Sequence, residues 1–198
     1  MYIHLMEISP HPERALRHGD ALATLVPDAG HLLHMPTHVD VLCGDYQNVV
    51  SRNHSAIIAD RKYLELAGAD NFYSVYRCHN YHFKIYGAMF LGQPSVALEA
   101  AEELIATIPE DFLRELAGWF EGFIPMKQHV LIRFGRWRDI LAQPLPEDAE
   151  LYAVTTKTTL PQVGGIGQQT VATLSARMRA RPREPKSCDL TQTSRSLN

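Results

Sequence analysis

The chain contains few cysteines, and none of them is paired by spacing. Three occur in 198 residues, Cys43, Cys78 and Cys188, and no two of them form a CxxC motif. This excludes a disulfide framework and a cysteine zinc site, and it favours a reducing compartment. No apolar run reaches the roughly 18–20 residues of a membrane span, and the first residues lack the basic and apolar regions of a secretory signal. We therefore expect a cytoplasmic protein with no membrane partner.

Several catalytic signatures are also absent. There is no HExxH, the metalloprotease helix motif, and no GxSxG, the serine-hydrolase elbow. Gly164, Gly165 and Gly167 are not followed by Lys-Ser or Lys-Thr, so they predict no phosphate loop and no nucleotide cofactor. Residues 1–150 carry 12 basic and 20 acidic residues, a net charge of −8. This part of the chain therefore lacks the basic face that nucleic-acid binding requires.

Apolar residues recur at helical spacing through most of residues 1–142, and no segment alternates convincingly at period two. Within the helical pattern, we expect the aromatic residues Trp119, Phe120 and Phe123 to lie in the core and Asp60 to lie on a helix surface. The pattern predicts an all-α domain over residues 1–150, with helices over residues 12–25, 46–66, 72–91, 95–108 and 112–134, the last of them interrupted near Pro125.

Residues 151–198 have a different composition. They carry seven basic and two acidic residues, and beyond about residue 177 they contain almost no large apolar side chains. Such a segment cannot bury enough surface to offset the entropy of ordering it. We predict a basic, low-complexity and disordered tail.

Three segments of the domain share one shape. Each is an apolar helix end, a glycine, a short polar turn and a new apolar helical stripe, and the glycines are Gly44, Gly92 and Gly135. Glycine suits the left-handed residue that closes a helix. The repeated unit is thus predicted to be an αα-hairpin of the kind that stacks into a solenoid.

These units resemble tetratricopeptide (TPR) repeats. The second unit fits best, with Ala97, Ala101 and Leu104 at helical spacing after Gly92 and with Pro109 at its end. The strings GHLLHMPTHV, CHNYHF and IRFGRWRDILAQP look like those of a histidine-rich group of bacterial and fungal TPR-domain proteins. The resemblance implies a TPR-like solenoid, in a shortened member of that group, whose concave groove is lined by the first helix of each unit.

Ten histidines occur, all before residue 130, and several share a register. His31, His34 and His38 lie 13, 10 and 6 residues before Gly44, and His79 and His82 lie 13 and 10 residues before Gly92. In a stacked solenoid, equivalent positions on neighbouring first helices are expected side by side, so the groove is predicted to be lined with histidine. We expect His11, His18 and His54, which lack such partners, to be solvated.

Imidazole is a suitable ligand for zinc, copper and iron, and residues three or four apart share a helix face. One or two divalent transition-metal ions are therefore predicted in the groove. Pro36 is expected to kink the helix between two of the candidate ligands. His4 and Glu7, one turn apart, form a ligand pair, a second-layer orienting pair or, as we favour, a surface pair. The predicted metal ligands are His31, His34, His38, His79, His82 and His4.

Three functions remain open at this point. The first is a scaffold that binds a protein, peptide or small-molecule partner in the groove. The second is a metal-dependent enzyme, hydrolytic or oxidative, with a histidine-ligated ion. The third is a shortened remnant that associates with itself through uncapped solenoid ends. For any single histidine, such as His79 on an apolar stripe, the alternative is a purely structural role as a hydrogen-bonded core residue.

Overall fold

The computed structural model describes residues 1–120 and 122–143, with residue 148 and the single positions 165, 168, 169, 172 and 176. Regular structure in these residues is entirely helical, which confirms the all-α class. The predicted tail, apart from those single positions, lies outside them. The helices are α1 (Tyr2–Glu7), the 3₁₀ helix η1 (Pro12–Ala15), α2 (Leu16–Leu25), α3 (Gly30–His34), α4 (Thr37–Cys43), α5 (Tyr46–Ala67), α6 (Tyr73–Phe90), α7 (Pro94–Ala106), α8 (Glu110–Glu115), α9 (Ala117–Phe120), α10 (Met126–Arg133) and α11 (Trp137–Leu141).

The three predicted glycine turns are confirmed. Gly44, Gly92 and Gly135 have φ angles of 77°, 69° and 65°, the left-handed conformation that glycine adopts without steric cost. Each follows the end of one helix by no more than two residues, and a new helix starts two residues after it. At the first of these starts, the Asp45 carboxylate accepts a hydrogen bond from the backbone N–H of Asn48 at 3.1 Å and caps α5.

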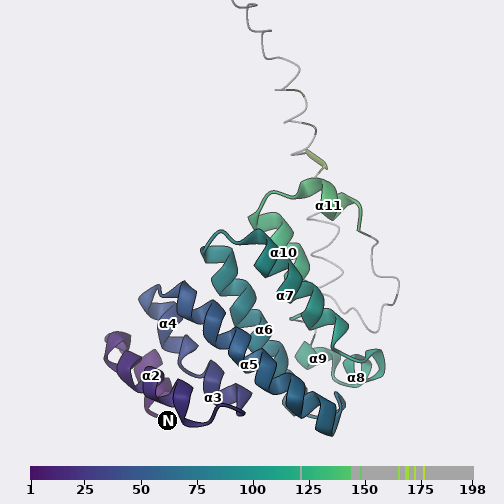
Figure 1. The fold of residues 1–198 in the computed structure, drawn as a ribbon. Helices are drawn as coiled ribbons and strands as arrows, with labels where there is room; N and C mark the ends of the chain where they lie inside the picture. The colour runs from purple at the N-terminus through teal and green to yellow at the C-terminus, as the bar shows by residue number, and fades with distance from the viewer. Residues whose placement is uncertain are drawn as a thin grey trace, which may run out of the picture.

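Helices that follow one another along the chain pack side by side (Figure 1). α3 and α4 pack on α5, α5 on α6, α6 on α7, and α7 on α10. The contact between α5 and α6 is close because Gly87 has no side chain: a Cβ atom there would lie 2.9 Å from Cγ1 of Val49. The largest core cluster is built from α5, α6, α7 and the helices that follow them.

Two features of this arrangement position the site. The chain breaks between α3 and α4 at Met35 and Pro36, as the proline predicts. The short helix α1 packs against α4, with Ile3 buried in a small cluster beside Met35 and Val39. As a result, the first residues of the chain lie next to the histidines of α4. In the part of the chain described here, no helix is both long and apolar enough to cross a membrane.

Candidate metal centre

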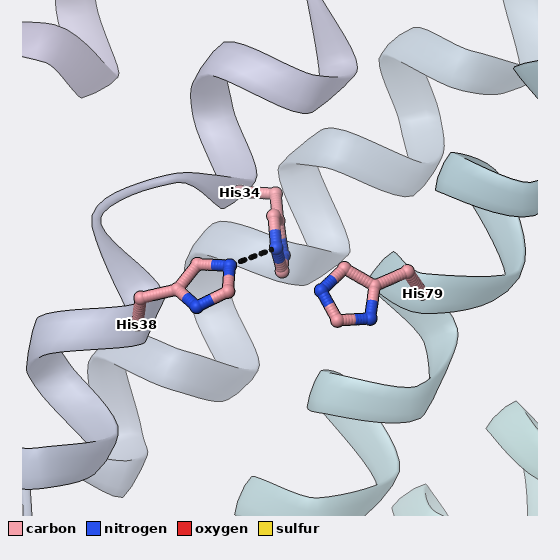
Figure 2. Close-up of side chains that lie close together, drawn as sticks. All are labelled: His34, His38 and His79. Carbon is pink, nitrogen blue, oxygen red and sulfur yellow. Dashed lines mark hydrogen bonds between the residues drawn. The ribbon is translucent and has the colours of Figure 1, made fainter. Parts of the chain in front are cut away.

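Three of the predicted ligands come together. His34 is the last residue of α3, His38 lies in the first turn of α4, and His79 lies in the middle of α6. Each offers one ring nitrogen, and these three atoms all lie within 4.8 Å of one another. Figure 2 shows the ring of His79 directed toward the other two, with a ring nitrogen foremost. His34 is fully buried, and the other two are half-buried.

The spacing of the rings suits one shared ion. Three imidazoles that bind one ion at about 2.0–2.1 Å have ring centres about 5 Å apart. Here the ring centres of His34 and His38 are 4.8 Å apart, those of His34 and His79 are 4.7 Å apart, and those of His38 and His79 are 5.6 Å apart. The ring centres are therefore spaced about as they would be around one ion.

The tautomer of His34 follows from its partners. The side-chain amide of Asn53 donates to the carbonyl of Val49 at 2.8 Å, so its oxygen is the atom that faces His34. That oxygen lies 2.7 Å from Nδ1 of His34. The Thr37 hydroxyl donates to the His34 carbonyl at 2.7 Å, and its oxygen also lies toward Nδ1. Two acceptors at Nδ1 mean that this atom carries the hydrogen and that the lone pair is on Nε2.

His38 is oriented in the same way by a carboxylate. Oε1 of Glu7, the last residue of α1, lies 2.8 Å from Nδ1 of His38, and Oε2 lies 3.3 Å from Nδ1 of His4. Burial opposes ionisation of Glu7, but the hydrogen bonds and charges of His38 and His4 together outweigh it and lower the pKa of Glu7. The ionised carboxylate accepts a hydrogen from Nδ1, which leaves Nε2 of His38 to face the site. This is the carboxylate–histidine arrangement that orients metal ligands.

The Nε2 atoms of His34 and His38 are 3.0 Å apart (Figure 2). Both Nδ1 hydrogens are already engaged, so two lone pairs would face each other across this distance. Two bare acceptors repel, and a positive charge between them removes the repulsion. A metal ion that binds both nitrogens would supply that charge.

Burial keeps two of the three rings neutral. It lowers the pKa of His34 to about 2 and that of His79 to about 4. The ring of Phe83 adds to the apolar surroundings, because its centre lies 4.8 Å from the ring centres of His34, His38 and His79 alike. Neutral imidazoles in an apolar setting have free lone pairs, which metal binding requires.

The other three predicted ligands lie around this group rather than in it. His31 stacks on His34 at 5.9 Å, and His4 lies on the outer side of Glu7. His82 faces away toward Phe123, with ring centres 5.8 Å apart. The remaining histidines before residue 60, His11, His18 and His54, are exposed, as expected.

The predicted side-by-side register of the histidines is wrong by one turn. His34 lies beside His79, not beside its sequence equivalent His82, and His31 lies against Tyr76 at 4.7 Å. The displacement is not confined to α3, because His38 on α4, six residues before Gly44, lies beside Phe83, nine residues before Gly92, with ring centres 4.8 Å apart. Equal spacing from a turn glycine therefore does not place residues of neighbouring helices side by side.

Sequence reasoning missed several supporting residues. Glu7 hydrogen-bonds His38, which lies 31 positions later in the sequence. The predicted surface pair of His4 and Glu7 therefore accounts for only one of the two hydrogen bonds of Glu7. Asp60, predicted on a surface, is 1% exposed and accepts hydrogen bonds from Tyr73 at 2.8 Å and Asn80 at 2.7 Å. One signal was present for Asp60 and Asn53: both interrupt the apolar stripe of α5, where a polar residue must find a buried partner.

The His34, His38 and His79 group can thus hold a metal, with Glu7 and Asn53 orienting two of its ligands. Three nitrogen ligands would leave at least one coordination position for water or another small ligand, as catalytic zinc sites do. No protein-family model, curated protein or solved structure matches this chain. The function is therefore inferred from the geometry of the site itself.

Proposed function

We propose that this protein binds one divalent transition-metal ion, zinc, copper or iron, through His34, His38 and His79. The observation that carries the proposal is the pair of Nε2 atoms 3.0 Å apart, whose lone pairs are aimed at one point by Glu7 and Asn53. A buried structural histidine is satisfied by one acceptor for its N–H and one donor for its other ring nitrogen. Here the Nδ1 atoms of two neighbouring rings, His34 and His38, are each engaged by an acceptor, and a third ring lies beside them. A ligand that all three rings share explains this arrangement better.

The centre supports metal-dependent chemistry more than a purely structural ion. Structural zinc sites are closed by four protein ligands, whereas sites with three keep a position open. An ion held this way polarises whatever occupies that position, which serves hydrolytic or oxidative reactions. The frame that we propose is a TPR-like stack of helix pairs, which the glycine turns at Gly44, Gly92 and Gly135 support.

The test is a metal titration of the full chain, purified without a nickel column and stripped with a chelator. We expect one equivalent of Co²⁺ to bind and to give the visible absorption of a low-symmetry cobalt site, and Zn²⁺ to displace it. His38→Ala and His79→Ala should each weaken binding by about 100-fold or more. His54→Ala is the matched control, because His54 is exposed on α5 and outside the group.

Circular dichroism of each variant shows whether the helices are retained. Uptake of no metal by the folded wild-type chain would overturn the proposal. Equal metal affinity in the wild type and in folded His38→Ala and His79→Ala would overturn it as well.

Binding of a partner or ligand in a histidine-lined groove, the first function considered from sequence, stays a prediction. It has one specific observation in its favour. Three large aromatic side chains beside the histidines are exposed, namely Phe72, Tyr76 and Trp119. A metal centre and a binding surface are compatible, because the exposed ring of Tyr76 contacts His31, and His31 stacks on His34 of the metal centre.

A further inference from the structure

A continuous line of ring contacts leads from the surface to the metal centre. Trp119 contacts Phe72 at 6.2 Å, Phe72 contacts Tyr76 at 6.1 Å, and Tyr76 contacts His31 at 4.7 Å. His31 in turn stacks on the ligand His34. We call Tyr76, Phe72 and Trp119 the aromatic strip.

Exposure rises steadily along this line. His34 is 0% exposed, Tyr76 is 38%, Phe72 is 58% and Trp119 is 64% exposed. The prediction that Trp119 lies in the core is therefore wrong, although its neighbour Phe120 is fully buried. Exposed aromatic rings that touch one another are unusual on a soluble surface and mark places where something binds. Here the three rings lead from the solvent-exposed surface toward the proposed ion.

His31, between the strip and the centre, has an unused polar atom. Its Nδ1 is buried and has no hydrogen-bond partner among the described residues. Its backbone is held in place, because its N–H donates to the Tyr73 hydroxyl at 3.3 Å and that hydroxyl donates to buried Asp60. Leaving such an atom unpaired is unfavourable, so a buried polar atom without a partner points to a missing ligand atom.

The charge of the centre selects the kind of ligand. Three neutral imidazoles leave the charge of a divalent ion uncompensated, and Glu7 neutralises only part of it from behind His38. The strip itself presents rings and no carboxylate. An anion with oxygen donors would complete the coordination, accept or donate a hydrogen bond at His31, and lay an apolar body on the rings.

We propose that the metal centre binds a small aromatic anion, whose oxygen atoms bind the ion beside His31 and whose ring lies on the aromatic strip. This inference rests on the proposed metal site and names the ligand class of that site. The order of the ring contacts sets the expected position of the ligand: its aromatic ring lies nearest Tyr76, which contacts His31, and a longer apolar body extends toward Phe72.

The test compares two probes that differ only in the ring. Benzohydroxamate and acetohydroxamate have the same two oxygen donors, and only the first has an aromatic group. Each is titrated into the full chain loaded with Co²⁺, and binding is followed through the change in the cobalt absorption. We expect benzohydroxamate to bind about 10-fold more tightly, because each aromatic contact contributes a factor of about 2 to 12.

The variants locate the difference. Tyr76→Ala should lower the affinity ratio of the two probes by about 3- to 10-fold, and Trp119→Ala should lower the ratio for a biphenyl hydroxamate, which is long enough to reach further along the strip. Tyr86→Ala is the matched control, because Tyr86 is also 38% exposed on α6 but contacts Phe90 instead of the strip. It should leave the ratio unchanged.

The outcomes distinguish failure of the aromatic-ligand proposal from failure of the metal-site proposal on which it rests. If no cobalt site forms before any probe is added, the metal proposal fails and this inference fails with it. If cobalt binds but the two probes bind equally well, only the aromatic ligand class is refuted. The same holds if benzohydroxamate is preferred but Tyr76→Ala and Tyr86→Ala behave alike.

Discussion

Acid should destabilise the metal-free protein through His34, by an amount that the structure allows us to work out. Burial lowers the pKa of His34 from 6.5 to about 2. Below pH 6.5 the imidazole of His34 is therefore protonated in the unfolded chain but stays neutral in the folded chain until the pH approaches 2. The contribution of neutral His34 to stability is complete above pH 6.5 and is lost as the pH falls toward 2.

At pH 5 the unfolded imidazole is about 1.5 pH units below its pKa, and each unit is worth about 1.4 kcal/mol. We expect His34 alone to lower the free energy of unfolding by about 2 kcal/mol between pH 7.5 and pH 5. The titratable side chains that face it are His31, His38 and His79. His79 acts in the same direction, because its own pKa is lowered to about 4.

Two buried carboxyls, Asp40 and Asp60, act in the opposite direction, because burial raises the pKa of each. Burial raises the pKa of Asp40 to about 6, so folding favours its protonated form and acid stabilises the protein through it. By pH 5 this offsets roughly 1 kcal/mol of the loss. The pH dependence of the wild type alone therefore mixes two signs, and a difference between two chains is needed.

The assay is urea unfolding, followed by circular dichroism, at several pH values in the presence of a chelator. His34→Gln keeps a polar side chain near Asn53 but cannot titrate. The wild type should lose about 2 kcal/mol more than this variant between pH 7.5 and pH 5, whatever the variant costs at neutral pH. His18→Gln, an exposed histidine on α2, controls for the loss of an imidazole. Parallel pH curves for the wild type and His34→Gln would refute the reasoning.

Two further predictions concern the support of the site. Glu7→Gln should weaken metal binding by about 10- to 100-fold while leaving the helices intact, as measured by competition with a chelator; Glu13→Gln, an exposed residue of η1, should not. Gly30→Ala should destabilise the protein by about 1–3 kcal/mol in urea unfolding, because its Cβ atom would lie 1.9 Å from Oδ1 of Asp60, whereas Gly118→Ala meets open space.

The helices could be predicted because their signals are local. Apolar residues at 3.6-residue spacing place α5, α6 and α7 to within about two residues, and Gly44, Gly92 and Gly135 mark the turns between helices. These features depend on residues close in sequence, where spacing and backbone conformation act directly. The segment predicted over residues 112–134 divides into three short helices instead, because the turns near Leu116 and before Pro125 leave no periodicity long enough to recognise.

The site could be predicted only in part, for a related reason. The spacing of His34 and His38 predicted that they share a helix face, and their pairing with α6 followed from the repeat. The residues that decide what this group can do lie elsewhere: Glu7 is 31 positions from His38, and Asn53 is 19 positions from His34. Long-range contacts leave no period in the sequence.

The register error explains why the histidine count alone overstates the ligand set. Six histidines fit an ideal stack of equal helices, but α3 is displaced by about one turn relative to α6, so that His31 lies against Tyr76 and His34 lies against His79. The displacement takes His31 out of the proposed ligand group, and its Nδ1 is buried with no hydrogen-bond partner among the described residues. A stack in perfect register would bury its histidines in matched pairs. The displaced stack instead brings three histidines together and leaves a fourth beside them with an unused polar atom, which is why we assign His31 to the ligand of the proposed metal and not to the metal itself.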